Sequence, residues 1–341
     1  MFKFNEFCDY VEMTLPEILP DHLKNAHIEQ HEVEKNNGLV LHSVTVRPED
    51  STIAPNLYLD NYFKRYEEGA SIDDLMDEIK DVAVKNLDAP AEFSNVAEMF
   101  KDFESVKDKI VMVAVNTERN QNLLTQIPHQ DREDLSLIYK IMVGSNDEGT
   151  ATITIRNEHM AYWGVDAEQL HELAMTNTRE ILPVTIQSMN EVMREMFGKD
   201  GMPAEMADVM FEEMPPTQQM YIISNSAKVN GAASMFYEDA LSDLCKKMGT
   251  DLYILPSSVH EVIAVSSEMG TPDDLSQMVR EVNGSQVAPE EQLSDHVYKF
   301  EAATKKLSLA DVSLEELKKA AGAENMSQGV VTEGSRPRKV R

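Results

Sequence analysis

The sequence contains only two cysteines, Cys8 and Cys245, in 341 residues. Two thiols cannot form a disulfide framework, and they are too few for a cysteine-based zinc site. Aromatic residues are also scarce, at 6% of the chain, whereas methionine is frequent, with 21 residues. Methionine fills irregular space but specifies rigid packing poorly, so we expect a methionine-rich, adaptable interior.

Long apolar runs are absent as well. No segment approaches the roughly 18 consecutive apolar residues of a membrane-spanning helix. The first residues, MFKFNEFCDYVEM, contain neither the apolar stretch nor the small-residue cleavage site of a secretory signal. The sequence therefore predicts a cytoplasmic protein that does not contact a membrane.

Basic residues are outnumbered by acidic ones. The chain has 31 Lys and Arg against 60 Asp and Glu, and its net charge is −29. Nucleic acids and anionic membranes are bound largely through Lys and Arg. The composition therefore argues against direct nucleic-acid binding, and a partner of the acidic surface should be a basic protein. The alternative is that the acidic surface only keeps the protein soluble.

Short β-rich runs and amphipathic helices follow one another along the chain. Residues 28–46 are typical of two strands joined by a turn at Asn36–Gly38. Because hairpins replace regular strand–helix–strand alternation, we expect an α+β fold with mostly antiparallel sheets and flanking helices. We expect one α+β unit over residues 1–125, a second over 126–301, and a mobile, disordered tail over 302–341 that contains one possible short helix.

Four phrases of the chain are distinctive. They are ILPVTIQSMNEVM, YIISNSAKVNGAA, DLYILPSSVHEVIAV and VNGSQVAPEEQLSDHVYKF. With them, residues 4–300 resemble an uncharacterised family of proteins with a domain of unknown function, encoded by intestinal clostridia and their relatives. Residues 132–307 are more weakly similar to a second uncharacterised family, from bacilli. Neither resemblance implies catalytic residues, so both leave the function open.

The segment PSSVHE places a serine two residues before a histidine. In an extended chain Ser258 and His260 point to the same face, so they could act as nucleophile and base, with Glu261 orienting the ring. Known triads, however, collect their members from distant segments, and the glycine-flanked nucleophile turn is missing. Proline and serine are good turn formers between two β-rich runs. We therefore favour a hairpin turn here.

The segment SNSAKVNGAAS leads from a predicted strand into a helix whose first turn contains only small residues. Small residues let an anionic ligand approach the free N–H groups of a helix start. The alternative is a capped helix that packs closely on a sheet. If this turn and PSSVHE lie at one end of a sheet, Asn225, Asn230, Ser257 and His260 could line one ligand pocket.

The methionines of residues 188–214 recur at helical spacing, for example Met189, Met193 and Met196. A soft core face is our preferred interpretation; an adaptable partner surface and a copper(I) site are the alternatives. Glu168 and His171 form one Glu-x-x-His pair, whereas a di-iron bundle needs two. We predict no bound metal and no cofactor.

Two functions from different classes remain. The first is an intracellular bacterial binding or regulatory protein whose acidic surface meets a basic partner, without enzymatic activity. The second is a small-molecule-binding protein or hydrolase-like enzyme that uses the PSSVHE and NGAA turns. A pocket that joins the two turns would favour the second function.

Overall fold

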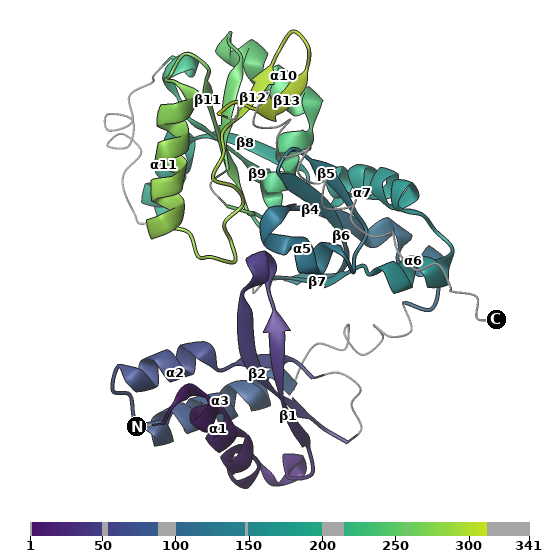
Figure 1. Cartoon of the computed structure of the whole chain (residues 1–341), viewed down its shortest axis with the longest axis vertical. Helices are drawn as coiled ribbons and strands as arrows, with labels where there is room; N and C mark the ends of the chain where they lie inside the picture. The colour runs from purple at the N-terminus through teal and green to yellow at the C-terminus, as the bar shows by residue number, and fades with distance from the viewer. Residues whose placement is uncertain are drawn as a thin grey trace, which may run out of the picture.

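The computed structural model has helices packed on antiparallel sheets, the α+β class expected from the sequence (Figure 1). It describes residues 2–49, 54–87, 100–146, 149–199, 215–256 and 258–311. Figure 1 shows a smaller N-terminal unit and a larger part, which we call the body and which comprises the described residues from 100 onward. A long hairpin rises from the N-terminal unit and reaches the body beside α5 and β7.

The N-terminal unit is built on a three-stranded antiparallel sheet in the order β1-β2-β3. Its elements are α1 (Phe4–Ile18), η1 (Asp21–Leu23), β1 (His27–Glu34), η2 (Asn36–Gly38), β2 (Val40–Arg47), β3 (Asn56–Tyr58), α2 (Asp60–Glu67) and α3 (Ile72–Leu87). Phe7, Val11 and Leu15 of α1 and Leu75 and Ile79 of α3 are buried, at the spacing that places them on one helical face. Together with buried side chains of the sheet, these two faces form the core of the unit. We call the hairpin β1–η2–β2 the arm.

The body contains two antiparallel sheets. One has six strands in the order β13-β12-β10-β11-β9-β8; in the other, β6 lies between β4 and β5 and also pairs with β7. The strands are β4 (Ile110–Asn116), β5 (His129–Arg132), β6 (Leu135–Asn146), β7 (Gly149–Thr154), β8 (Val184–Ser188), β9 (Tyr221–Asn225), β10 (Leu252–Leu255), β11 (Val262–Ser266), β12 (Tyr298–Glu301) and β13 (Lys306–Leu309). The helices are η4 (Phe103–Ser105), η5 (Lys107–Lys109), η6 (Glu118–Asn120), α5 (Gln121–Leu124), α6 (Asn157–Trp163), α7 (Ala167–Ile181), α8 (Met189–Lys199), η7 (Pro216–Gln218), η8 (Gly231–Phe236), α10 (Glu238–Met248) and α11 (Pro272–Ser285).

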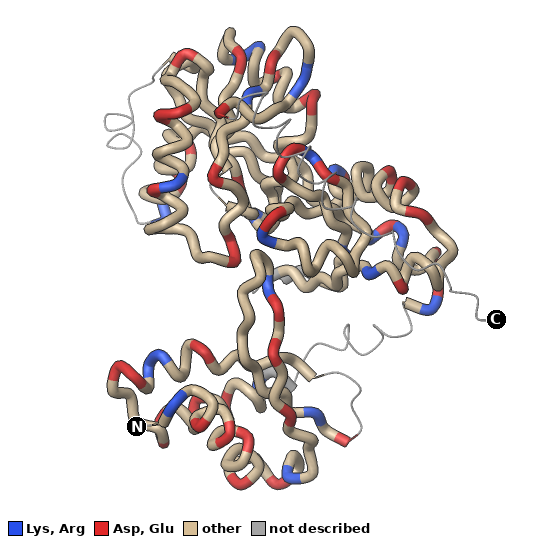
Figure 2. The backbone as a smooth tube through the Cα atoms, viewed as in Figure 1, with Lys and Arg blue, Asp and Glu red and all other residues tan. Residues whose placement is uncertain are grey.

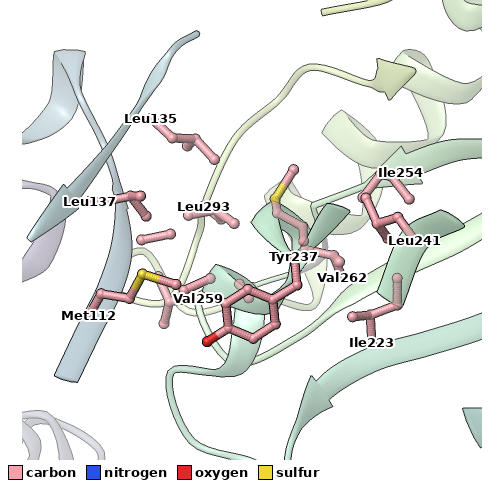
Figure 3. Close-up of a cluster of buried hydrophobic side chains, with 14 of the residues drawn as sticks. Met112, Leu135, Leu137, Ile223, Tyr237, Leu241, Ile254, Val259, Val262 and Leu293 are labelled. Atoms are coloured by element: carbon pink, nitrogen blue, oxygen red, sulfur yellow. The ribbon is translucent and has the colours of Figure 1, made fainter. Parts of the chain in front are cut away.

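The two sheets of the body share one apolar core. Figure 3 shows side chains of the smaller sheet, such as Met112 and Leu137, in the same cluster as Ile223 and Val262 of the larger sheet. Buried residues of α7 and α10 belong to this cluster as well. On its other face the six-stranded sheet packs against α11, through Leu275 and its neighbours. The body therefore has sheets and helices arranged in layers around a continuous interior.

The change from one core to the other occurs earlier in the chain than the division at residue 125 that the sequence suggests. The core of the N-terminal unit ends at Ala83, and the core of the body begins at Val106. β4 lies within the expected first unit but pairs along its length with β6. The strand that pairs with a buried strand can be distant in the sequence, and the local sequence of the buried strand does not identify it.

The start of the expected tail also differs from expectation. β13 pairs with β12, and its residues Leu307 and Leu309 pack against the core of the body. Residues 302–311 thus continue the sheet, whereas residues 312–341, with nearly all of the possible short helix, lie outside the described residues. Within the described ranges, no helix is both long and apolar enough to cross a membrane.

Candidate functional site

Lys140 lies in the middle of β6 among apolar neighbours. Side chains alternate along a strand, so Leu137, Tyr139 and Ile141 face the main core of the body. Ile138 and Lys140 face the opposite side, where Ile138 belongs to a small apolar cluster with side chains of β4 and α5. The alternation of β6 therefore places one ammonium group beside an apolar wall.

The tip of the arm docks on the body through polar contacts of Asn37. Its backbone is left-handed, with φ of 61°, a conformation that asparagine tolerates better than most residues. The Asn37 N–H donates to Asn120 Oδ1 at 2.9 Å, and Asn120 Nδ2 donates to Asn37 Oδ1 at 3.0 Å. Asn37 Nδ2 donates to the carbonyl oxygens of Pro289 and Gln292, each at 2.7 Å. These bonds hold the arm against η6 and against the loop after α11.

A cavity of about 660 Å³ lies where the arm meets the body. Its apolar wall consists of Val33, Leu41, Val113, Val115, Leu123, Ile127, Ile138 and Val259. Its polar lining consists of Glu34, Lys35, Asn36, Tyr58, Lys140, Thr154, Arg156, Asn230, His260, Glu290 and Glu291. The volume lies within the range of about 300–1,000 Å³ that is usual for small-molecule pockets.

Two of the basic residues that line the cavity, Lys35 and Lys140, are half-buried. Burial, and to a smaller extent the charge of Lys35, lowers the pKa of Lys140. Lys35 Nζ donates to the hydroxyl of Tyr58 at 2.5 Å and lies 4.1 Å from the centroid of that ring. No salt bridge joins Lys35 or Lys140 to a carboxylate of the described residues.

Other charged groups lie nearer to solvent. Arg156 is exposed and donates to Gln126 Oε1 at 3.0 Å. The side chain of Glu34 is exposed as well, and that of Glu291 is 47% exposed. The cavity is therefore lined by two half-buried lysines, by the half-buried Glu290 and Glu291, and by the exposed Glu34 and Arg156.

The two turns singled out in the sequence meet at one end of the six-stranded sheet. The Asn230 N–H donates to His260 Nδ1 at 3.1 Å, and the Gly231 N–H donates to the His260 carbonyl at 3.0 Å. Ser224 Oγ donates to the same carbonyl at 2.8 Å. A Cβ atom on Gly231 would lie 2.3 Å from Ser224 Oγ, so only glycine permits this approach. Asn230 and His260 line the same cavity.

The hydrogen bonds of His260 define its tautomer. Because Nδ1 accepts from a backbone N–H, the proton of the neutral ring is on Nε2. Nε2 lies 3.4 Å from Glu291 Oε1, and the ring is 32% exposed. The carboxylate beside the ring therefore belongs to Glu291, in the loop after α11, and not to the neighbouring Glu261.

Ser258 and Glu261 contribute to the turn between β10 and β11. These strands form the antiparallel hairpin expected from the sequence. Ser258 Oγ accepts from the His260 N–H at 3.0 Å, and the Ser258 N–H donates to the Glu261 carbonyl at 3.1 Å. Within the described ranges, no hydrogen bond joins the Ser258 hydroxyl to the His260 ring. A catalytic role of Ser258, His260 and Glu261 stays a prediction.

Asn225 is buried, and its side chain stabilises the turn that leads into η8. Its Oδ1 accepts from the N–H groups of Ala227 and Val229 at 3.1 and 3.3 Å, and its Nδ2 donates to the Val229 carbonyl at 2.8 Å. Asn225 does not line the cavity. Ser257, the fourth residue of the expected pocket, lies outside the described residues.

The expected metal-free state is still a prediction. In the described ranges, no group of three or more His, Cys, Asp or Glu side chains is placed to hold a metal ion. His171 of the single Glu-x-x-His pair instead lies with Nδ1 3.2 Å from the Tyr139 hydroxyl. The methionines of residues 200–214 lie outside the described residues, while Met196 of α8 is 61% exposed.

Sequence reasoning missed the basic side chains of the cavity and the tyrosine beside them. Lys35, Tyr58 and Arg156 come from separate segments, and only the docked arm brings them together. One local signal existed, because Lys140 interrupts the run LSLIYKIMV at a position on the same strand face as Ile138. A lysine on an otherwise apolar strand face indicates either an edge or a site.

Comparison with known protein families gives one match. Residues 4–302 match the model of a family of unknown function, DUF5688. The chain belongs to this family. The matched range covers the N-terminal unit, the arm, the body and thus every residue that lines the cavity. No curated protein and no solved structure matches the chain. The family assigns no chemistry, so function has to be inferred from the cavity itself.

Proposed function

We propose that this protein binds a small organic molecule in the cavity between the arm and the body. The observation that supports the proposal is the convergence of the NGAA and PSSVHE turns, through Asn230 and His260, on a cavity of about 660 Å³. The cavity offers an apolar wall and hydrogen-bonding groups together, which is the usual composition of a ligand site.

A ligand in this position would contact both parts of the molecule. Val33 and Tyr58 belong to the N-terminal unit, whereas Ile138 and His260 belong to the body. Binding to the docked form would therefore stabilise docking by mass action. This linkage is what a regulatory protein requires, because occupancy of the site would change the arrangement of the two parts.

A thermal-shift screen of metabolites, repeated on a variant with a filled cavity, tests the proposal. Thr154 lines the cavity, and Thr154→Phe should remove the shift produced by any true ligand. Thr152→Phe is the control, because Thr152 is a half-buried residue of the same strand that does not line the cavity. Ligands that shift both variants equally would bind elsewhere, which would contradict the proposal.

A second candidate function is binding of a basic protein by the acidic surface. β1 is an edge strand of its sheet, and Glu29, Glu32 and Glu34 on it are exposed. In Figure 2, further Asp and Glu residues colour the backbone of the neighbouring helices of the N-terminal unit. The immobilised protein should capture a basic protein from a nuclease-treated bacterial lysate at low salt. High salt should release that partner. Unchanged capture by the double variant Glu29→Gln/Glu32→Gln would argue against this surface.

We also propose that the protein is bacterial and cytoplasmic. The support is the resemblance of the chain to proteins of clostridia and bacilli, together with its two buried, unpaired cysteines. Fractionation of a native host would test the compartment. A catalytic function is not part of the proposal, because in the described part of the chain the Ser258 hydroxyl makes no hydrogen bond to the ring of His260.

A further inference from the structure

Lys140 places an ammonium group at the cavity. It lies in the middle of a strand, next to the wall formed by Val113 and Ile138, and its β6 neighbours pair with β4 on one side and β7 on the other. Neither a salt bridge nor a side-chain hydrogen bond connects it to the described residues. Charged groups in apolar surroundings are costly unless an opposite charge compensates them.

The described part of the chain places three carboxylates at the cavity, those of Glu34, Glu290 and Glu291. Glu34 is exposed, and Glu291 lies beside His260. Glu290 also lines the cavity, where its carbonyl accepts from Asn36 Nδ2 at 2.7 Å. None of these three carboxylates forms a salt bridge with Lys140.

Lys35 adds a second positive charge from the arm. Its position is held by the ring and the hydroxyl of Tyr58. The Tyr58 oxygen accepts from Lys35, so the hydroxyl proton is available to donate to a ligand. Lys35 lowers the pKa of Lys140, as expected of like charges in proximity. Two amines and one hydroxyl therefore line the cavity, and neither amine forms a salt bridge with a carboxylate of the described residues.

We propose that the ligand of this cavity is an organic anion with an apolar body, whose charged group is held by Lys140 and Lys35 and whose apolar part packs on Val113, Val115 and Ile138. This inference rests on the proposed function and names the chemical class of its ligand. The three carboxylates at the cavity disfavour a ligand with several negative charges, so a single carboxylate or sulfonate fits best. Asn230 and His260, which also line the cavity, would contact polar groups of the ligand.

A matched pair of fluorescent probes tests the inference. 1-Anilinonaphthalene-8-sulfonate carries a sulfonate on an aromatic body, and N-phenyl-1-naphthylamine has the same body without the charge. We expect the full-length protein to bind the sulfonate at least about tenfold more tightly, because a charge-assisted contact is worth one order of magnitude or more. Lys140→Met should remove this difference and leave the affinity for the neutral probe within about twofold.

Two control variants separate the possible failures. Lys64→Met removes an exposed lysine of α2 outside the cavity and should change neither affinity. Thr154→Phe should weaken the binding of both probes. Equal affinities that are insensitive to Lys140→Met but sensitive to Thr154→Phe would overturn the anion inference and leave the proposed function intact. Insensitivity of both probes to Thr154→Phe would overturn both proposals.

Discussion

The N-terminal unit and the body differ in how completely each covers its own sheets. In the body, two sheets share one core, and α11 covers the far face of the larger sheet. The N-terminal unit has a compact core between α1, α3 and its sheet, but its arm extends beyond that core to the body (Figure 1). The tip of the arm is held by asparagine side chains and backbone carbonyls, not by an apolar interface.

This difference explains where the cavity lies. The smaller sheet of the body has a second face with a small apolar cluster, and the arm covers it without filling it. Polar contacts fix the position of the arm, while apolar packing stabilises each part separately. The protein thus joins two independently packed parts around a space that a ligand can occupy.

The largest effect should follow from Gly231→Ala, in the body. The added Cβ would lie 2.6 Å from the backbone nitrogen of Asn225 and 2.7 Å from the carbonyl oxygen of His260. Relief of such overlap requires backbone movement, and we expect a loss of about 4 kcal/mol in the free energy of unfolding. Urea unfolding followed by the fluorescence of Trp163, the single tryptophan, measures the body. Gly284→Ala in α11, where no atom lies within 4 Å of the added Cβ, is the control.

Leu15→Ala should destabilise the N-terminal unit by about 3 kcal/mol, the usual cost of a cavity at a fully buried leucine. If the two cores are independent, the unfolding transition seen by circular dichroism should split. The transition seen by Trp163 fluorescence should stay at its original urea concentration. A parallel shift of both signals would mean that the two parts unfold as one, contrary to the comparison above.

Asn37→Gly should weaken docking of the arm by about 2 kcal/mol, since it removes three side-chain hydrogen bonds of the tip. Glycine preserves the left-handed backbone, so the loss reports the side chain. We expect faster proteolysis within the arm and unchanged stability of each core. Lys305→Gly is the matched control, because Lys305 also has a positive φ, 55°, but lies far from the tip in sequence, between β12 and β13. Equal protease resistance of wild type and Asn37→Gly would show that these bonds do not hold the arm.

The lowered pKa of Lys140 predicts a pH effect at the cavity. Burial and Lys35 hold this pKa below the ordinary value of 10.5. Between the two values the unfolded chain binds more protons than the folded chain, so stability should rise with pH across that window. Lys140→Met should abolish the rise. Urea titrations at a series of alkaline pH values measure it, and an identical pH profile of the variant would contradict the assignment.

The smallest effect is expected at His296. Its hydrogen bond to Asp311, at 3.1 Å, raises the pKa of the ring above the ordinary value of 6.5. This contact should stabilise the protein fully below about pH 6.5, and the contribution should disappear as pH rises through the folded-state pKa. The ring is 39% exposed, so we expect less than about 1 kcal/mol. His296→Gln and Asp311→Asn should each flatten the same part of the pH profile, and a change in only one variant would indicate a different partner.

Much of the fold could be predicted from local sequence. The arm follows from β-rich runs around an Asn-Asn-Gly turn, and the β10–β11 hairpin from a Pro-Ser-Ser turn between apolar strands. The pairing of β4 with β6 could not be predicted, because a uniformly buried strand carries no mark of its partner. β13 could not be predicted for a different reason: it is a strand of only four partly exposed residues, and its polar flanks resemble a tail.

For the candidate site, the sequence by itself determined the two turns, with Asn230 and His260, and the alternation that turns Lys140 away from the main core of the body. These features depend on residue type and on the two-residue period of a strand. Only the tertiary structure decided that Lys35 and Tyr58 join them, that Glu291 accompanies His260, and that a cavity lies between them. The contribution of Lys35 and Tyr58 depends on the docking of an arm whose tip, Asn37, is more than 80 residues away in sequence from its partner Asn120. The pairing of Glu291 with His260 joins two separate loops of the body. No local pattern encodes either contact.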